Sequence, residues 1–322
     1  MAAKGVIALA TAALSALLVA APAPAPAAAA PAAGFRVGVI SDLNQNYGST
    51  RYGSAVHAAV DALRTRFRPP LVLITGDMVA GQKRGVDAPA MWRGFRAAVT
   101  DPLERGGIAL APTPGNHDAA PGFDAERAAY AHEWAHPDER LSMIDGANYP
   151  LRYSFSFRGA FFLSLDAARV GPLGAEQRAW VERQLAEASR YHPRIVFGHV
   201  PLYPIAHGRE KDILYDDELE RVFARYGVDL YVSGHHHAYY PGATASLRQL
   251  AMPCLGGGAR PLIGTRGASS QALALLEIDR GALTSVEAFS APDFDRPIAR
   301  ERLPRRITLG RRTLTRDDLL GN

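Results

Sequence analysis

The chain has 322 residues, of which 48% are hydrophobic and 21% charged, a balance typical of a globular protein rather than a disordered one. Its net charge of +4 comes mainly from residues 291–322, which hold 8 Arg and 5 acidic residues; without this segment and Lys4 the chain is neutral. The charge distribution excludes a uniformly basic body and gives no firm indication of a nucleic-acid partner.

The first 33 residues are predicted to be a secretory signal peptide. Lys4 precedes an apolar run from Gly5 to Ala20, and an Ala/Pro tract with small-residue cleavage sites follows. Cleavage is expected between Ala21 and Gly34. The apolar run is short for a membrane span, although an uncleaved anchor is the alternative.

The chain is therefore expected to be exported, to a bacterial periplasm or to the medium, with no stable membrane span after cleavage. The single cysteine, Cys254, excludes an internal disulfide, and its apolar surroundings predict a buried packing residue.

Apolar runs of strand length alternate with helical patterns along the rest of the chain. The predicted strands are 36–41, 71–76, 108–115, 194–200 and 229–234. The predicted helices are roughly 54–67, 88–105, 123–136, 174–191 and 215–226. Strand alternating with helix predicts an α/β fold with parallel strands.

Two longer β-rich regions interrupt this alternation. Residues 153–166 read as a hairpin that turns at Arg158-Gly159, and residues 272–290 as another that turns near Arg280-Gly281. The hairpins indicate a mixed sheet or two packed sheets. One domain is expected over residues 34–290, followed by an Arg-rich C-terminal tail, 291–322, expected to be a solvated surface arm.

Polar side chains gather after each predicted parallel strand, where α/β proteins bind ligands. In chain order they are Asp42 and Asn44, Asp77, Asn116 to Asp118, His199, and His235 to His237. One such residue is more often satisfied locally than functional. Together at one sheet edge, however, the carboxylates, amide oxygens and imidazoles suit divalent cations.

The chain resembles the calcineurin-like metallophosphoesterases, to which the purple acid phosphatases are related. The resemblance lies in the order and spacing of five motifs, "SDLN", "GD", "GNHD", "GH" and "GHHH". The resemblance runs from about Arg36 to Tyr240. It implies a four-layer α/β/β/α sandwich of two mixed sheets flanked by helices, which agrees with the hairpins.

The resemblance also implies roles for individual residues. Asp77 would bridge two divalent metal ions (Mn, Fe or Zn). The remaining implied ligands are Asp42, Asn44 and His237 for one metal, and Asn116, His199 and His235 for the other. His117 would face the leaving oxygen of the substrate, with Asp118 orienting it.

One position departs from the family pattern. Asn44 stands where the family usually has His, and an amide oxygen is a poorer donor to a transition metal than an imidazole. The Tyr that purple acid phosphatases place three residues after the bridging Asp is also missing, because Ala80 occupies that position.

The three consecutive histidines are predicted to be unequal. If the segment is extended, its side chains alternate, so that His235 and His237 face the metals and His236 is a packing residue. The function expected from the resemblance is hydrolysis of a small phosphate ester, mono- or diester, by a bridging hydroxide. The alternative is a non-catalytic metal- or polyanion-binding protein on the same scaffold.

Overall fold

The structure is a computed structural model that describes residues 1–2 and 34–320. The predicted signal peptide lies almost entirely outside the described residues. The described residues 34–320 belong to one compact unit. Among the residues that the structure describes, no helix combines the length and apolarity needed to cross a membrane.

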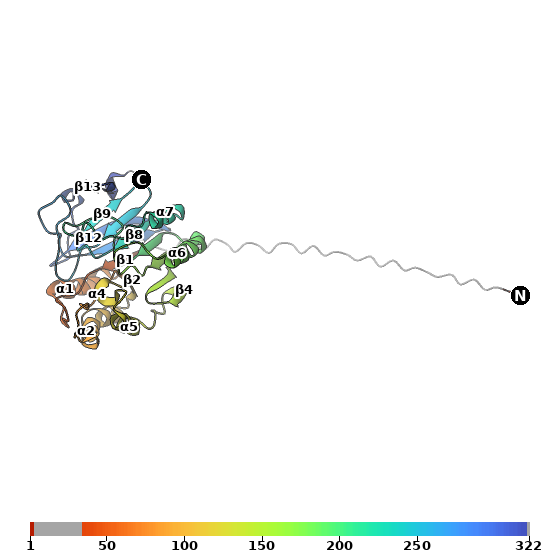
Figure 1. Cartoon of the computed structure of the whole chain (residues 1–322), viewed down its shortest axis with the longest axis horizontal. Helices are drawn as coiled ribbons and strands as arrows, with labels where there is room; N and C mark the ends of the chain where they lie inside the picture. The colour runs from red at the N-terminus through yellow and green to blue at the C-terminus, as the bar shows by residue number, and fades with distance from the viewer. Residues whose placement is uncertain (3–33, 321–322) are drawn as a thin grey trace. The chain divides into compact units, whose positions relative to one another are not determined.

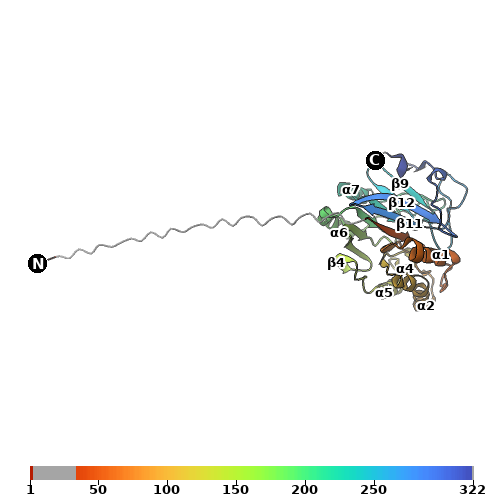
Figure 2. The ribbon, with the colours of Figure 1, turned by 180° about the vertical axis from the view of Figure 1, so that it is seen from behind.

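The fold is built on two mixed β-sheets (Figures 1 and 2). The smaller sheet places its strands in the order β12 (Ala282–Ser290), β11 (Ala272–Asp279), β1 (Phe35–Ile40), β2 (Leu71–Ile74) and β3 (Ala109–Pro112). Strands β1, β2 and β3 are parallel, and the hairpin β11–β12 joins them antiparallel to β1.

The larger sheet has nine strands. Their order is β13 (Arg306–Leu309), β14 (Arg312–Arg316), β9 (Tyr240–Ala243), β10 (Arg248–Ala251), β8 (Leu230–Ser233), β7 (Arg194–Phe197), β6 (Ala160–Ser164), β5 (Arg152–Phe157) and β4 (Ser142–Asn148). Strands β6, β7, β8 and β10 form a parallel centre, and antiparallel pairs extend it on both sides.

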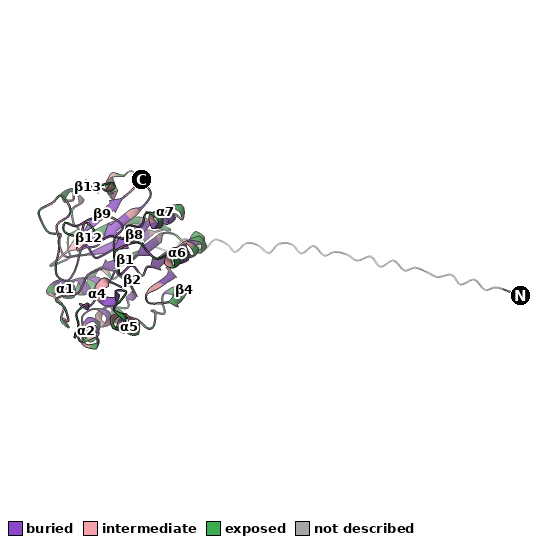
Figure 3. Cartoon of the chain, in the orientation of Figure 1, coloured by how far each residue is buried: buried purple, intermediate pink, exposed green. Residues whose placement is uncertain are grey.

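The two sheets pack face to face around the main hydrophobic core. The inward residues of one sheet, such as Val39 and Leu73, belong to the same buried cluster as Phe155 and Phe197 of the other. Figure 3 shows both sheets as predominantly buried. Strands buried on both faces read as continuous apolar runs, which is why the sequence pattern predicted them.

Helices cover the outer face of each sheet. α1 (Ser54–Ala62), α2 (Ala88–Phe95) and α5 (Asp124–Glu133) share a buried cluster with the smaller sheet, and α6 (Ala175–Glu187) and α7 (Asp217–Arg225) share one with the larger sheet. Two short helices, α3 (Asp101–Arg105) and α4 (Asn116–Ala119), complete the set. The layers are therefore helix, sheet, sheet, helix, and the predicted fold class is confirmed.

The expected solvated arm after residue 290 is not what the structure has. β14 pairs with β9 through Thr315 and Arg316, and β13 pairs with β14. Ile307 and Leu314 of these strands are buried beside Tyr240. The Arg-rich composition suggested solvation, but alternating buried residues let the segment extend the larger sheet.

Candidate metal centre

The loops that follow β1 and β2 hold two buried carboxylates side by side. The amide of Asp42 donates to the carbonyl of Gly76 at 3.1 Å, and the amide of Leu43 donates to that of Asp77 at 2.9 Å. Both Asp side chains are almost fully buried. Ser41, which the sequence analysis did not single out, donates its hydroxyl to Asp42 at 2.6 Å.

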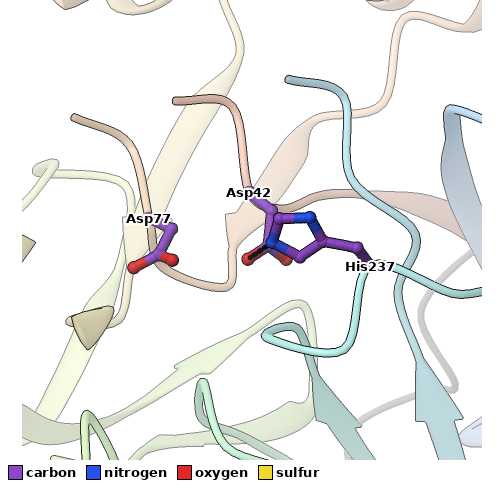
Figure 4. Close-up of side chains that lie close together, drawn as sticks. All are labelled: Asp42, Asp77 and His237. Atoms are coloured by element: carbon purple, nitrogen blue, oxygen red, sulfur yellow. Dashed lines mark ion pairs between the residues drawn. The ribbon is translucent and has the colours of Figure 1, made fainter. Parts of the chain in front are cut away.

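The first group of potential ligands is Asp42, Asp77 and His237, whose ligand atoms all lie within 4.8 Å of one another (Figure 4). Nε2 of His237 is 3.2 Å from the Asp42 carboxylate. On the other side of the ring, Nδ1 donates to the carbonyl oxygen of Gly258 at 3.1 Å. This hydrogen bond leaves Nε2 facing the carboxylates.

The second group gathers around the side-chain oxygen of Asn116, at the start of α4. Nε2 of His199 and Nδ1 of His235 each lie 2.9 Å from that oxygen. Nε2 of His199 is also 3.4 Å from the Asp77 carboxylate. Nδ1 of His199 donates to the carbonyl of Thr75 at 2.9 Å, which orients the ring. Asp77 therefore belongs to both groups.

Four of the ten non-glycine residues with positive φ in the described part of the chain belong to the two ligand groups. Asp42, Asp77, His235 and His237 all have positive φ angles, between 50° and 65°, in the left-handed region that non-glycine residues rarely adopt. Such strain costs about 1–3 kcal/mol per residue and persists where the surrounding structure enforces it. Its coincidence with four of the predicted ligands marks this sheet edge as a functional site.

Glycines before two of the motifs allow the loops to approach each other. A Cβ atom on Gly234 would lie 2.2 Å from the Ser41 hydroxyl and 2.6 Å from the Asp42 carboxylate. One on Gly115 would lie 2.1 Å from the backbone nitrogen of Asp77. Any larger residue at either position would push the two ligand groups apart.

Charge interactions among these side chains are strong. Burial disfavours the charged form of His199, but the Asp77 carboxylate outweighs it and raises the pKa of His199 to about 9. Burial likewise opposes the charge of His237, whereas the Asp42 carboxylate and the neighbouring Cys254 thiol raise its pKa to about 11. The pKa of Asp77 stays well below its usual range despite burial, because of His199 and His117.

These properties fit divalent cations. Among the described residues, the buried carboxylates of Asp42 and Asp77 form ion pairs only with histidines and with no Lys or Arg. In both His199 and His237, Nδ1 donates to a backbone carbonyl, which leaves Nε2 as an acceptor in the neutral ring. Nε2 of each ring faces a side-chain oxygen, so two acceptors meet unless a proton or a cation lies between them. Mixed O and N ligands of this kind suit Mn, Fe or Zn.

His117 lies at the edge of both groups. Its backbone amide donates to the Asp77 carboxylate at 2.8 Å, and its ring nitrogen Nε2 is 4.0 Å from the same group. The ring packs against Tyr47 with 5.4 Å between centroids and keeps some exposure. Nδ1 has no hydrogen-bond partner among the described residues. The ring is thus placed to meet a bound molecule.

Asp118 is buried between the loops that follow β2 and β3. Its carboxylate accepts hydrogen bonds from the backbone amides of Val79, at 2.9 Å, and Gly115, at 3.1 Å. Burial and the negative charge of Asp77 raise the pKa of Asp118 to about 8. These contacts hold the loops after β2 and β3 together, and an orienting role toward His117 stays a prediction.

His236 points away from both ligand groups. Its Nδ1 accepts from the amide of Ile205 at 3.2 Å, and its Nε2 donates to the carbonyl of Asp212 at 2.9 Å. The predicted alternation of side chains along an extended segment is wrong as the explanation, because His235 and His237 adopt left-handed turn conformations. The turn, not alternation, separates the three rings.

Asn44 lies beside the first group through its backbone. Its amide donates to the carbonyl of Asp77 at 3.1 Å, and its carbonyl accepts from Gly257 at 3.2 Å. Its side chain is buried and forms no hydrogen bond with another described residue. Its role as a ligand stays a prediction.

The backbone carbonyls of Thr75 and Gly258, which orient His199 and His237, were not predicted. Every residue has a backbone carbonyl, so the sequence does not indicate which of them accept such hydrogen bonds.

Comparison with known proteins agrees with this arrangement. A family model described as calcineurin-like phosphoesterase matches residues 35–239, and the chain belongs to this family. The predicted membership is therefore confirmed, and the matched region contains every residue of both ligand groups.

Individual relatives are distant. Over 139 residues the chain is 32% identical to purple acid phosphatase 15 of Arabidopsis thaliana, which covers 41% of this chain and only 25% of that protein. In fold the chain is similar to purple acid phosphatase PPD1 from yellow lupin, with a TM-score of 0.58 at 15% identity, covering 80% of this chain and 52% of that one. It is also similar to a dimetal phosphatase from Danio rerio, with a TM-score of 0.50 at 18% identity, covering 80% and 98%.

Proposed function

We propose that the protein hydrolyses phosphate esters with the help of two divalent metal ions. The observation that carries the proposal is the position of Asp77, whose carboxylate belongs to both groups of potential ligands. Asp42 and His237 would complete one site, with Asn44 as the predicted further ligand. Asn116, His199 and His235 would complete the other.

When bound, the two ions would supply positive charge to the phosphate oxygens and lower the pKa of a water molecule toward neutrality. The protein's own residues would orient the ligands and assist the leaving group. Carbonyls of Thr75 and Gly258 hold His199 and His237 in the tautomer that can bind metal. His117 would donate a proton or a hydrogen bond to the leaving oxygen.

The direct test is release of phosphate from 4-nitrophenyl phosphate by protein loaded with Mn²⁺, Fe²⁺ or Zn²⁺, before and after treatment with a chelator. We expect activity that the chelator abolishes and that added metal restores. Asp77→Asn should remove it, since both sites lose a shared charge. Activity that is indifferent to chelation and to Asp77→Asn would contradict the proposal.

The same assay with bis(4-nitrophenyl) phosphate distinguishes a monoesterase from a diesterase. The alternative function, non-catalytic metal or polyanion binding on the same scaffold, predicts bound metal without phosphate release from either ester. The placement of His117, which is not needed to hold metal, favours catalysis.

Export is part of the proposal. Lys4 and the apolar run after it support a cleaved signal peptide. Expression of the full chain in a bacterial host, followed by fractionation and N-terminal sequencing, should find the protein outside the cytoplasm with its N-terminus between Ala21 and Gly34. An uncleaved chain in the membrane fraction would indicate the anchor instead.

A further inference from the structure

Two loop segments of the larger sheet meet beside the candidate metal centre. Segment 205–212 follows β7 and segment 258–263 follows β10. They share two backbone hydrogen bonds, each of 2.9 Å, and an antiparallel bridge. The backbone amide of Arg260 donates to the carbonyl oxygen of His237 at 3.2 Å. The two segments therefore form one wall next to a potential metal ligand.

Arg260 in this wall carries an unneutralised positive charge. Within the part of the chain that the structure describes, its buried Nε atom has no hydrogen-bond partner and its guanidinium forms no ion pair. A buried guanidinium nitrogen without an acceptor is unfavourable, and an anion bound by the guanidinium would supply one.

Arg209 lies next to Arg260. A Cβ atom placed on Gly208 would be 3.6 Å from a terminal nitrogen of Arg260, so the guanidinium of Arg260 reaches the residue that precedes Arg209. Arg209 itself pairs with Asp212 at 2.8 Å. Arg209 thus engages the Asp212 carboxylate, whereas Arg260 has no carboxylate partner among the described residues, so its charge is available to an external anion.

The wall is also held at a fixed place relative to the metal centre. The His236 ring accepts from the amide of Ile205 and donates to the carbonyl of Asp212, so it fastens both ends of segment 205–212 to the turn after β8. This use of one nitrogen as acceptor and the other as donor requires a neutral ring.

We propose that Arg260, with Arg209 beside it, binds a second anionic group of the substrate while the reacting phosphate lies at the metal centre. The preferred substrates would be phosphate monoesters whose leaving portion carries a further phosphate or carboxylate. A planar guanidinium binds either group through paired hydrogen bonds. The inference rests on the proposed function and narrows its substrate class.

The test compares matched esters that differ only in the second anion. Fructose 1,6-bisphosphate is compared with fructose 6-phosphate for a second phosphate, and 3-phosphoglycerate with glycerol 3-phosphate for a carboxylate. We expect the metal-loaded protein to have a higher kcat/KM on the doubly anionic member of at least one pair. The favoured pair identifies whether phosphate or carboxylate is recognised.

The variant Arg260→Gln should lower this preference by roughly 10- to 100-fold, the range for a charge-assisted hydrogen bond. Arg260→Lys, which keeps the charge, should retain part of it. Arg266→Gln, on the same loop and exposed, is the matched control and should keep the preference of the unmodified protein.

Two outcomes would overturn the inference in distinguishable ways. If 4-nitrophenyl phosphate and all four esters are left intact in the presence of metal, the proposed function fails and the substrate class fails with it. If the esters are hydrolysed but neither pair shows a preference, or Arg260→Gln leaves the preference intact, the proposed function stands and the anion site does not.

Discussion

Among single residues, His117 is the one expected to separate metal binding from catalysis. Its ring lies 4.0 Å from Asp77 but belongs to neither ligand group. We expect His117→Ala to keep its metal content and to lose about 10²–10⁴-fold in turnover, the typical contribution of a general acid. The loss should be smaller for esters with good leaving groups. Elemental analysis beside steady-state kinetics provides the check, and metal loss in the variant would make His117 a ligand.

Asn44 is the residue at which metal affinity is expected to be weakest. An amide oxygen binds transition metals less tightly than an imidazole. We expect Asn44→His to strengthen the site formed by Asp42 and His237, seen as retention of a second metal at chelator concentrations that strip it from the unmodified protein. Gln45→His, on the same loop, is a control that should not have this effect. Two equally tight metals in both proteins would show that another group completes the site.

The protonation of His199 and His237 gives metal binding a pH dependence. Their pKa values without metal are about 9 and about 11, so at pH 7 both rings are imidazolium ions. A metal ion must displace one proton from each ring in order to bind it. Apparent affinity should therefore rise as pH increases from 6 toward 9. Calorimetry in buffers of different ionisation enthalpy should detect proton release on binding at pH 7. Affinity that is flat over this range would contradict the proton assignment.

The proximity of the candidate residues at one sheet edge could be predicted from sequence, whereas their conformations could not, and their roles stay predictions. Chemistry at strand ends indicated Asp42, Asp77 and the histidines, because each motif lies within a few residues of an apolar run. The positive φ of His235 and His237 depends on contacts with Asp42 and Gly258, which lie far away in sequence. The position of Cys254 beside His237 was missed for the same reason.

Among the elements, β14 is expected to contribute strongly to stability. Leu314 is almost fully buried in the same hydrophobic cluster as Ile205 and Leu262, which lie in segments 205–212 and 258–263. We expect Leu314→Ala to lower the free energy of unfolding by about 2–5 kcal/mol, as for other buried Leu residues. Leu309→Ala on β13 is the matched control, since Leu309 is 41% exposed and should change stability little. Equal unfolding midpoints in urea would show that β14 is dispensable.

Four strands missed from sequence share a physical cause, whereas a fifth, β4, was missed although it has seven residues. β9, β10, β13 and β14 have four or five residues each, and β9 contains Pro and Gly, which disfavour strands in isolation. Their pairing with an existing sheet supplies the stability that local propensity does not. By contrast, the hairpin at Arg158-Gly159 and the helices covering both sheets were predicted from local patterns because each carries its own turn or apolar face.

For the whole molecule, the candidate metal centre takes its residues from both sheets. Asp42, Asp77 and Asn116 follow strands of the smaller sheet, and His199, His235 and His237 follow strands of the larger one. Metal that binds only the folded state should add about 2.7 kcal/mol of stability at a concentration 100 times its Kd. We expect a chelator to lower the melting temperature by several degrees. Asp77→Asn should abolish most of this difference, and an unchanged melting temperature in the unmodified protein would contradict the arrangement.

The pairing of β1 with β11 limits how early during synthesis the candidate metal centre can form. Arg36 of β1 lies opposite Glu277 of β11, 241 residues further along the chain. During synthesis β1 cannot pair with β11 until most of the chain has been made. Closing so long a loop also slows folding. Asp42, six residues after Arg36, is therefore among the first of the ligands to be made and among the last to be fixed. A ribosome-bound chain ending before residue 272 should be unable to capture metal with the affinity of the finished protein.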